Sequence, residues 1–254
     1  ELYLYQNLFF DIRKMKMHLW DDLKGHLEIP YRKYAYVKDS NGQHVSLYGD
    51  RLKRVTNWDK DDPTLHESDV PPMTRFLVDQ YGDSDEASTG HRIMFFDIEV
   101  EVTEGFPDVQ KAQNPITSIA LYDSTTEQYF TYCFDPQKRI DNYTKGDESV
   151  EFYETEYEML NQFFQKYLEI RPTILSGWNS EFFDIPYLYN RAVRILGPEI
   201  ANLLSPISQV IYSEYKKKHT IAGVSSLDYL QLYRQFTFTQ QSSYRLDYIG
   251  EVEV

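Results

Sequence analysis

The alternation of apolar and polar residues changes along the chain, and the first part reads as short strands. The aromatic-rich segments "LYLYQNLFFDI" (2–12) and "YRKYAYVK" (31–38) favour strands. The segment directly after the second of these, "DSNGQ" (39–43), contains the Asn-Gly pair typical of a hairpin turn. The segment "MTRFLVDQY" (73–81) predicts a short helix. The sequence therefore predicts a small α+β module in this region.

Two acidic segments rich in turn-forming residues, 59–72 and 82–90, flank the predicted helix. Such clusters mark loops and linkers. We therefore expect a domain boundary at about residue 90, with an N-terminal domain over 1–90 and a second domain over 91–254.

The second domain has a clearer pattern of elements. Strands are predicted at 92–100, 116–124, 127–134 and 173–179, and helices at 154–170 and 180–198. The apolar face of the first helix comprises Met159, Leu160, Phe163, Phe164, Tyr167 and Leu168. The order strand, strand, strand, helix, strand, helix is typical of an RNase H-like α/β domain, although several α/β folds share it.

Composition places the chain among globular proteins. Of 254 residues, 41% are hydrophobic and 16% aromatic. No apolar run approaches the roughly 20 residues that span a bilayer, and the N-terminus lacks the pattern of a secretory signal. Because Cys133 is the single cysteine, disulfides within the chain are excluded and a reducing cytoplasm is the expected setting.

The net charge of −14 argues at first against binding to nucleic acid. The charge is unevenly placed, however, because residues 1–60 hold 11 basic and 8 acidic side chains. Salt screens interactions beyond about 8–10 Å. Local patches therefore decide binding, and the acidic total does not exclude a nucleic-acid substrate.

Two acids, Asp97 and Glu99, follow the apolar run "MFF" in the strand predicted at 92–100. Residues two apart in a strand share a face, with Cα atoms roughly 6.5 Å apart. Paired carboxylates suit hard divalent cations such as Mg²⁺ or Mn²⁺, which would keep both acids ionised. For an isolated Asp-x-Glu pair, a solvated strand end is the more common explanation.

A third acid, Asp184, lies between bulky apolar residues where a helix is predicted to begin. One alternative is that Asp184 caps this helix, and another is that Asn179 only ends the preceding strand. An apolar strand that delivers Asn179 and then Asp184 would nevertheless place a further carboxylate at a sheet edge.

At these residues the sequence resembles a known family. "FFDIEV" (95–100) and "NSEFFD" (179–184) resemble the first and second 3′–5′ exonuclease motifs of family B DNA polymerases. The segments 105–124, 174–191 and 225–251 are similar to the replicative polymerases of T-even-type phages. The resemblance covers residues 91–254 well and residues 1–90 loosely. It implies an RNase H-like exonuclease domain with a mixed sheet, preceded by a small α+β domain.

The resemblance also implies roles for individual residues. The catalytic and metal-binding residues would be Asp97, Glu99 and Asp184, at a two-metal site for Mg²⁺ or Mn²⁺. The DNA-binding residues would be Phe106, Asn179 and the hairpin lysines Lys216, Lys217 and Lys218. A basic hairpin tip that contacts only solvent is the alternative for these lysines.

The family's third exonuclease motif, Tyr-x-x-x-Asp, supplies a fourth carboxylate. No pair here fits it, since Tyr244 and Asp247 are three residues apart, and Asp228 in "SSLDY" is better interpreted as structural. We expect the fourth acid beyond Val254, together with the polymerase domain, so that the exonuclease domain would be incomplete at its C-terminus.

The function implied is the N-terminal and exonuclease region of a replicative DNA-directed DNA polymerase, which proofreads single-stranded 3′ ends. Expected partners are single-stranded DNA and primer–template DNA and, in the intact enzyme, a sliding clamp and other replisome proteins, with no membrane. If phage-encoded, it would act in the host cytoplasm. Two alternatives remain open: a catalytically silent nucleic-acid-binding fragment, and an RNase H-like nuclease with another substrate.

Overall fold

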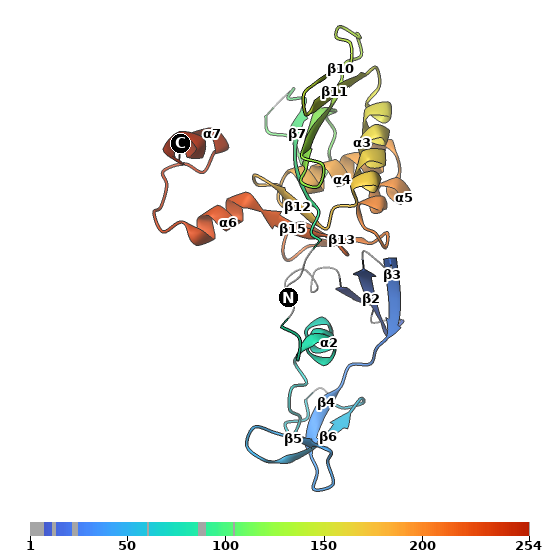
Figure 1. Cartoon of the computed structure of the whole chain (residues 1–254), viewed down its shortest axis with the longest axis vertical. Coiled ribbons are helices and arrows are strands. Elements are labelled where there is room, and N and C mark those ends of the chain that lie inside the picture. The colour runs from blue at the N-terminus through green and yellow to red at the C-terminus, as the bar shows by residue number, and fades with distance from the viewer. Residues whose placement is uncertain are drawn as a thin grey trace. The chain divides into compact units, whose positions relative to one another are not determined.

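The computed structural model describes residues 8–11, 14–21, 25–59, 61–85, 90–103 and 105–253. It divides the chain into two compact units, Glu1–Ser88 and Thr89–Val254 (Figure 1). Most of the segment at 2–12 that favours a strand lies outside the described residues; its described part, Leu8–Asp11, is a strand.

The first unit contains two small antiparallel sheets. Strands β1 (Leu8–Asp11), β2 (Lys16–Asp21) and β3 (Gly25–Pro30) form one sheet, against which α2 (Pro72–Tyr81) packs. The second sheet has the order β4-β6-β5, from β4 (Ala35–Lys38), β5 (His44–Val45) and β6 (Arg51–Val55). The short helix predicted from the sequence is confirmed.

The hairpin predicted at Asn41-Gly42 is wrong. The chain does turn there, because the Gly42 amide donates to the Asp39 carbonyl at 2.8 Å. The flanking strands β4 and β5 do not pair, however, since β6 lies between them. A Cβ atom on Gly42 would lie 2.3 Å from the backbone of Leu52. This glycine therefore permits a close approach of two backbones instead of a hairpin turn.

The second unit is built on a seven-stranded mixed sheet with the order β10-β11-β9-β8-β7-β12-β15. Its strands are β7 (Ile93–Val100), β8 (Ile116–Asp123), β9 (Gln128–Phe134), β10 (Tyr143–Lys145), β11 (Glu148–Tyr153), β12 (Ile174–Gly177) and β15 (Ser225–Asp228). Strands β7, β8 and β9 pair antiparallel, whereas β12 runs parallel to both β7 and β15. The mixed sheet expected from the family resemblance is confirmed.

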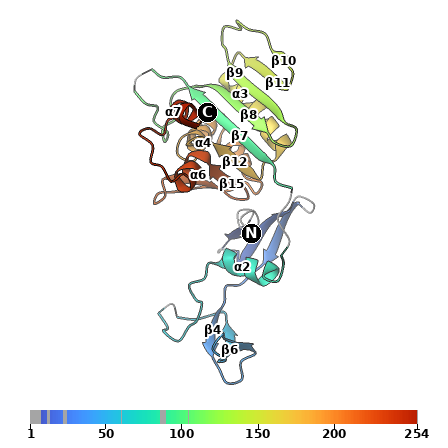
Figure 2. The ribbon, with the colours of Figure 1, turned by 60° about the vertical axis from the view of Figure 1, so that its left-hand side comes forward.

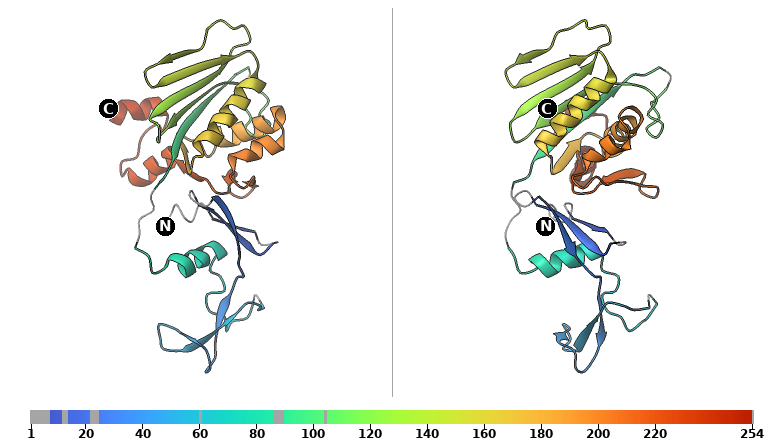
Figure 3. Two further views of the ribbon diagram at one scale, coloured as in Figure 1. Left: turned by 45° about the vertical axis from the view of Figure 1, so that its right-hand side comes forward. Right: turned by 90° about the vertical axis from the view of Figure 1, so that its right-hand side faces the viewer.

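Helices cover one face of this sheet. They are α3 (Glu156–Ile170) and α4 (Asp184–Ile195), followed by α5 (Pro198–Ala201) and η1 (Asn202–Leu204). Figures 2 and 3 show α3 lying along the strands. The later elements are the hairpin of β13 (Val210–Ser213) and β14 (Lys218–Ile221), then α6 (Tyr229–Phe236) and α7 (Leu246–Glu253). In Figure 1, α6 and α7 lie on the other side of the sheet from α3.

The core lies between the sheet and the covering helices. It includes Met94, Phe96 and Ile98 from β7, together with Phe163 of α3 and Leu188 of α4. Alternate residues of β7 therefore point into the core, while the intervening ones point to the opposite face. No described helix is long and apolar enough to cross a membrane.

The prediction for α3 is confirmed except at its last apolar position. Leu168 is 43% exposed, and Ile170 is buried in its place. The helix ends at Ile170, and its C-cap residue Arg171 has a left-handed backbone directly before Pro172. Strands β10 and β11 were not predicted. Every residue of β10 is exposed, and this strand lies at the sheet edge.

Strand β12 ends early beside β7. Its pairing with β7 begins at Ile174 and Ile93 and extends no further than Ser176 and Phe95. A Cβ atom on Gly177 would lie 2.6 Å from the Phe96 carbonyl oxygen. Asn179 then adopts a left-handed conformation with φ 65°. The chain thus leaves the sheet, and no strand of the described residues flanks the second half of β7 on this side.

We expect Gly177→Ala to destabilise the protein by about 2 kcal/mol, because the new methyl group would push β12 away from β7. Chemical denaturation measures the change in the free energy of unfolding. Gly250→Ala is the matched control, since Gly250 lies in α7 with nothing within 4 Å of its Cβ position. The control should be neutral or stabilising by up to about 1 kcal/mol. Equal effects of the two substitutions would contradict the close approach.

Candidate active site

Asp97 and Glu99 lie on the face of β7 opposite the core. Burial alternates along the strand, so that Phe95, Asp97 and Glu99 are exposed whereas Phe96 and Ile98 are buried. The two carboxylates share one face, as the spacing predicts. The strand carries these charges because only its other face packs into the core.

Asp184 is the first residue of α4 and is only 3% exposed. Its Oδ1 accepts a hydrogen bond from the Ile98 amide at 3.1 Å. The N-cap residue is Phe183, and no side chain caps the helix. The alternative that Asp184 is a helix cap is therefore wrong. Instead, its carboxylate takes a backbone donor of β7 beyond the point where β12 has ended.

The three acids influence one another. Partial desolvation of its carboxyl group, and then the charge of Glu99, raise the pKa of Asp97 above its usual range. Burial, and then the charge of Asp97, raise the pKa of Asp184 to about 7, with a smaller contribution from Asp228. Asp97 is thus coupled electrostatically to both of the other acids.

Carboxylate oxygens are the donors that Mg²⁺ and Mn²⁺ prefer, so the chemistry of Asp97, Glu99 and Asp184 fits such cations. Within the described part of the chain, however, no three potential metal-ligating side chains converge closely enough to form a ready-made cation site. Repulsion between like charges at these positions favours separation when no cation is bound.

Aromatic rings lie beside these acids. Phe106 is 81% exposed, and its ring centroid is 5.2 Å from that of Phe183, which immediately precedes Asp184. Phe182 is also exposed. The rings offer a stacking surface adjacent to the carboxylates.

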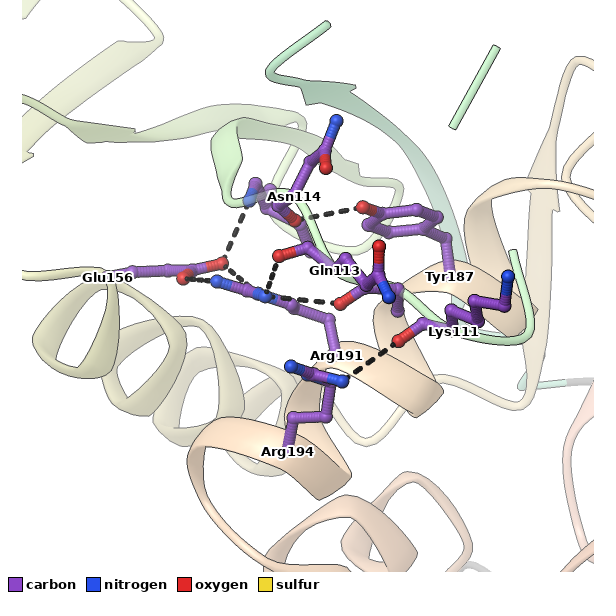
Figure 4. A network of polar contacts seen from close by, with 9 residues as sticks. Lys111, Gln113, Asn114, Glu156, Tyr187, Arg191 and Arg194 are labelled. Carbon is purple, nitrogen blue, oxygen red and sulfur yellow. Dashed lines mark hydrogen bonds and ion pairs between the residues drawn. The ribbon is translucent and has the colours of Figure 1, made fainter. Parts of the chain in front are cut away.

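The loop that carries Phe106 is fastened to α4 by side chains that donate to its backbone carbonyls (Figure 4). Arg191 Nη1 donates to the carbonyls of Ala112 at 3.1 Å and Gln113 at 2.6 Å. The Tyr187 hydroxyl donates to the Asn114 carbonyl at 2.8 Å. The loop between β7 and β8 is therefore held at several points along one helix.

Arg191 also forms a buried ion pair with Glu156. Its Nε and Nη2 donate to the two carboxylate oxygens at 2.8 and 2.5 Å. Glu156 Oε1 additionally accepts from the Ile116 amide at 2.8 Å. The sequence interpretation missed this pair. The sequence did contain a sign of it: Arg191 follows Leu188 and Tyr187 by three and four residues, which places an arginine on the buried face of α4.

Asn179 has a backbone role in the loop between β12 and α4. Its amide donates to Asp228 Oδ1 at 3.0 Å, and its carbonyl accepts from Phe182 and Phe183 at 3.1 Å each. Asparagine is one of the few residues that tolerate its left-handed conformation. These contacts shape the turn that leads to Asp184.

The basic hairpin is present, but its lysines differ from one another. Strands β13 and β14 pair antiparallel, and Lys218 already belongs to β14 instead of the tip. Lys217 pairs with Glu214 at 3.0 Å, and Lys218 pairs with Glu181 at 2.8 Å. Lys216 is exposed and has no ion pair among the described residues.

The mixed sheet with its covering helices is consistent with the exonuclease domain of family B DNA polymerases. The sequence profile of the DNA polymerase family B exonuclease domain matches residues 77–249. The chain belongs to this family.

Phage polymerases are among the similar proteins. The DNA-directed DNA polymerase of Escherichia phage RB69 is 36% identical over 192 residues, covering 64% of this chain and 21% of that protein. The enzyme of Enterobacteria phage T4 is 31% identical over 206 residues, covering 70% and 23%. DNA polymerase 1 of Saccharolobus solfataricus is 38% identical over 141 residues, covering 52% and 13%. The chain thus spans about a fifth of the length of its phage relatives.

We expect Asp184→Asn to stabilise the cation-free protein at neutral pH. Because the pKa of Asp184 is about 7 in the folded protein and about 3.9 in an unfolded chain, the folded state binds more protons between these values. Wild-type stability should then fall as the pH rises from about 4 to 7, by up to ~2–4 kcal/mol. Asparagine lacks this dependence.

Thermal unfolding in a chelating buffer from pH 4 to 8 measures this difference. The advantage of Asp184→Asn should be absent near pH 4 and largest above pH 7. Glu169→Gln, which removes an exposed carboxylate of α3, is the control and should show no such trend. A stability difference that is constant across this range would contradict the raised pKa.

Proposed function

We propose that this domain hydrolyses single-stranded DNA from its 3′ end and that Asp97, Glu99 and Asp184 are its catalytic residues. The observation that supports this most directly is the delivery of Asp184, at the start of α4, to the backbone of the strand that carries the other two acids. Sequence-distant segments thereby bring three carboxylates into one electrostatic cluster.

The same three residues would hold two Mg²⁺ or Mn²⁺ ions. When bound, such ions supply an activated water and stabilise the leaving 3′ oxygen. Asp97, which interacts electrostatically with both of the other acids, would hold these ions together with Glu99 and Asp184. The Ile98 amide holds one oxygen of Asp184 and thereby limits its rotation.

The substrate proposed is a single strand whose bases stack on exposed rings. Stacking on an aromatic side chain is worth ~1–3 kcal/mol per base and tolerates any base. Phe106 and Phe182 offer such rings beside the acids. Asn179, which lies in the turn before Asp184, would help to position the bound strand. Recognition of this kind is independent of sequence, which a proofreading enzyme requires.

In the whole protein, we propose that the domain proofreads for a replicative DNA-directed DNA polymerase. The names of the phage relatives support this assignment. Primer–template DNA, a sliding clamp and other replisome proteins would then be its partners, and the host cytoplasm its setting if it is phage-encoded. A Tyr-x-x-x-Asp motif elsewhere in the whole protein would supply the fourth carboxylate.

A catalytically silent nucleic-acid-binding module is the second candidate. It is favoured by the absence of a ready-made cation site among the described side chains. Hydrolysis of DNA by this chain, or by the whole protein alone, would support the exonuclease. DNA binding without hydrolysis by either would support the silent module.

We expect 5′-labelled single-stranded DNA to yield a ladder of shortened labelled products in Mg²⁺ or Mn²⁺, slowly with this chain and orders of magnitude faster with the whole protein. Asp97→Ala should abolish both hydrolysis and cation binding while the protein remains folded, because it removes the residue central to the cluster. Calorimetric titration with Mn²⁺ measures the binding. Glu169→Gln is the control and should behave as the wild type.

Three results would count against the proposal. These are release of the labelled nucleotide from the 5′ end, preference for an RNA of the same sequence, and unchanged Mn²⁺ affinity and stoichiometry in Asp97→Ala. Stable DNA binding without hydrolysis, even by the whole protein, would instead identify the silent module.

We also propose that the hairpin lysines Lys216, Lys217 and Lys218 contact DNA phosphates at primer–template junctions. Each phosphate contact contributes about 0.7 to the slope of log affinity against log salt for single strands. Replacing all three lysines with alanine should therefore flatten this slope by up to ~2. Among the single substitutions, Lys216→Ala should flatten the slope most, because Lys217 and Lys218 are already paired with acids.

Binding of the whole protein to junction DNA at several salt concentrations measures this slope. Lys145→Ala, an exposed lysine on the edge strand β10, is the control. A slope in the triple variant equal to that of the control would show that the hairpin is a solvated turn.

A further inference from the structure

A carboxylate outside the proposed catalytic set lies beside the loop that leads to Asp184. Asp228 is the last residue of β15, the sheet-edge strand that pairs with β12, and is 2% exposed. Neither the Asp97–Glu99 pair nor the sequence motifs assign it a task in the reaction. Its contacts, however, reach into the turn between β12 and α4.

The Asp228 carboxylate accepts three backbone hydrogen bonds. Oδ1 accepts from the amides of Asn179 at 3.0 Å and Leu230 at 2.9 Å, and Oδ2 accepts from the Glu181 amide at 3.2 Å. Only the bond from Leu230 is a helix cap, at the start of α6. The other two bonds hold residues almost fifty positions earlier in the chain.

These two bonds act on a loop that is confined at other points. Gly177 lies against the Phe96 carbonyl at its beginning, and Asp184 is bonded to the Ile98 amide at its end. Between them, the Glu181 side chain pairs with Lys218 at 2.8 Å. Asp228 supplies the backbone anchors in the middle of the loop, directly before the exposed ring of Phe182.

We propose that Asp228 is a positioning residue, which fixes the loop 178–183 so that Asp184 and Phe182 are held in place for the substrate. The activity part of this proposal rests on the proposed exonuclease function; the loop geometry does not. A carboxylate suits this task because it offers two acceptor oxygens to converging amides and donates nothing that would compete with them.

Asp228→Asn removes the loop bond from Glu181 and preserves both the loop bond from Asn179 and the helix cap. One oxygen remains, and it can keep accepting from Asn179 and Leu230. The new amide group would face the Glu181 amide, donor against donor, and leave that bond unmade. The substitution changes no volume, so that the protein should fold. The matched control is Asp123→Asn, since Asp123 is also buried and accepts from Thr125 and Thr126 in the turn between β8 and β9.

Trp178 provides a reading of the loop that does not depend on hydrolysis. Its indole N–H donates to the Tyr244 carbonyl at 3.0 Å, and its ring lies near those of Tyr229 and Tyr233. The other two tryptophans, Trp20 and Trp58, belong to the first unit and can be replaced by phenylalanine in every protein compared. The tryptophan fluorescence then comes from Trp178 alone.

We expect acrylamide to quench Trp178 at least twofold more efficiently in Asp228→Asn than in Asp123→Asn. In the whole protein, we expect kcat for single-stranded DNA to fall at least tenfold in Asp228→Asn only, with thermal unfolding midpoints similar in the two variants. A purely structural role would lower the midpoint and leave kcat per folded molecule unchanged.

Equal quenching in the two variants overturns the proposal, and so does increased quenching with unchanged kcat. If the wild-type whole protein does not hydrolyse DNA, the exonuclease function fails, whereas Trp178 quenching still tests the anchoring of the loop. If the wild type is active and Asp228→Asn is equally active, the positioning role alone fails.

Discussion

The buried ion pair between Arg191 and Glu156 is the constraint on which the second unit depends. It joins α4 to the first turn of α3, and through Ile116 it reaches the start of β8. Removing one partner of such a pair typically costs about 3–5 kcal/mol, because the other charge is left buried and unpaired. The same guanidinium holds the carbonyls of Ala112 and Gln113, so that the loop bearing Phe106 is built from the pair outward (Figure 4). A core of apolar contacts alone would pack the helices without fixing this loop.

The site itself arises from an interrupted sheet. If β12 continued beside β7, its backbone would occupy the Ile98 amide, and no side chain would reach it. Instead β12 stops at Gly177, and the amide is taken by Asp184 from the next helix. Three features shape the loop between β12 and α4. They are the close backbone approach at Gly177, the left-handed Asn179 and the hydrogen bonds to Asp228. Together they direct the chain from β12 to α4, so that the Asp184 carboxylate reaches the backbone of β7.

Much of this arrangement follows from local patterns, and the rest does not. The period of two in β7 placed Asp97 and Glu99 on one face, and the helical period of α3 identified its buried side except at Leu168. Strand β10 was missed because an exposed edge strand needs no apolar residues. The Asn-Gly turn was misjudged because β4 pairs with β6, which comes later in the chain, and not with β5 directly after the turn. The roles of Glu156, Arg191 and Asp228 depend on contacts between distant segments, which no periodicity records.

The acidic character of the site is preserved by the way its carboxylates are held. The described hydrogen bonds of Asp184 and Asp228 come from backbone amides, not from lysine or arginine side chains. Lys218 lies close to the loop but is paired with Glu181. A cationic side chain bound to these acids would neutralise the charge that, in the proposed function, would attract a divalent ion. Amide dipoles orient the carboxylates without neutralising them. Burial chiefly raises the pKa of Asp184, and the charge of Asp97 adds to this effect.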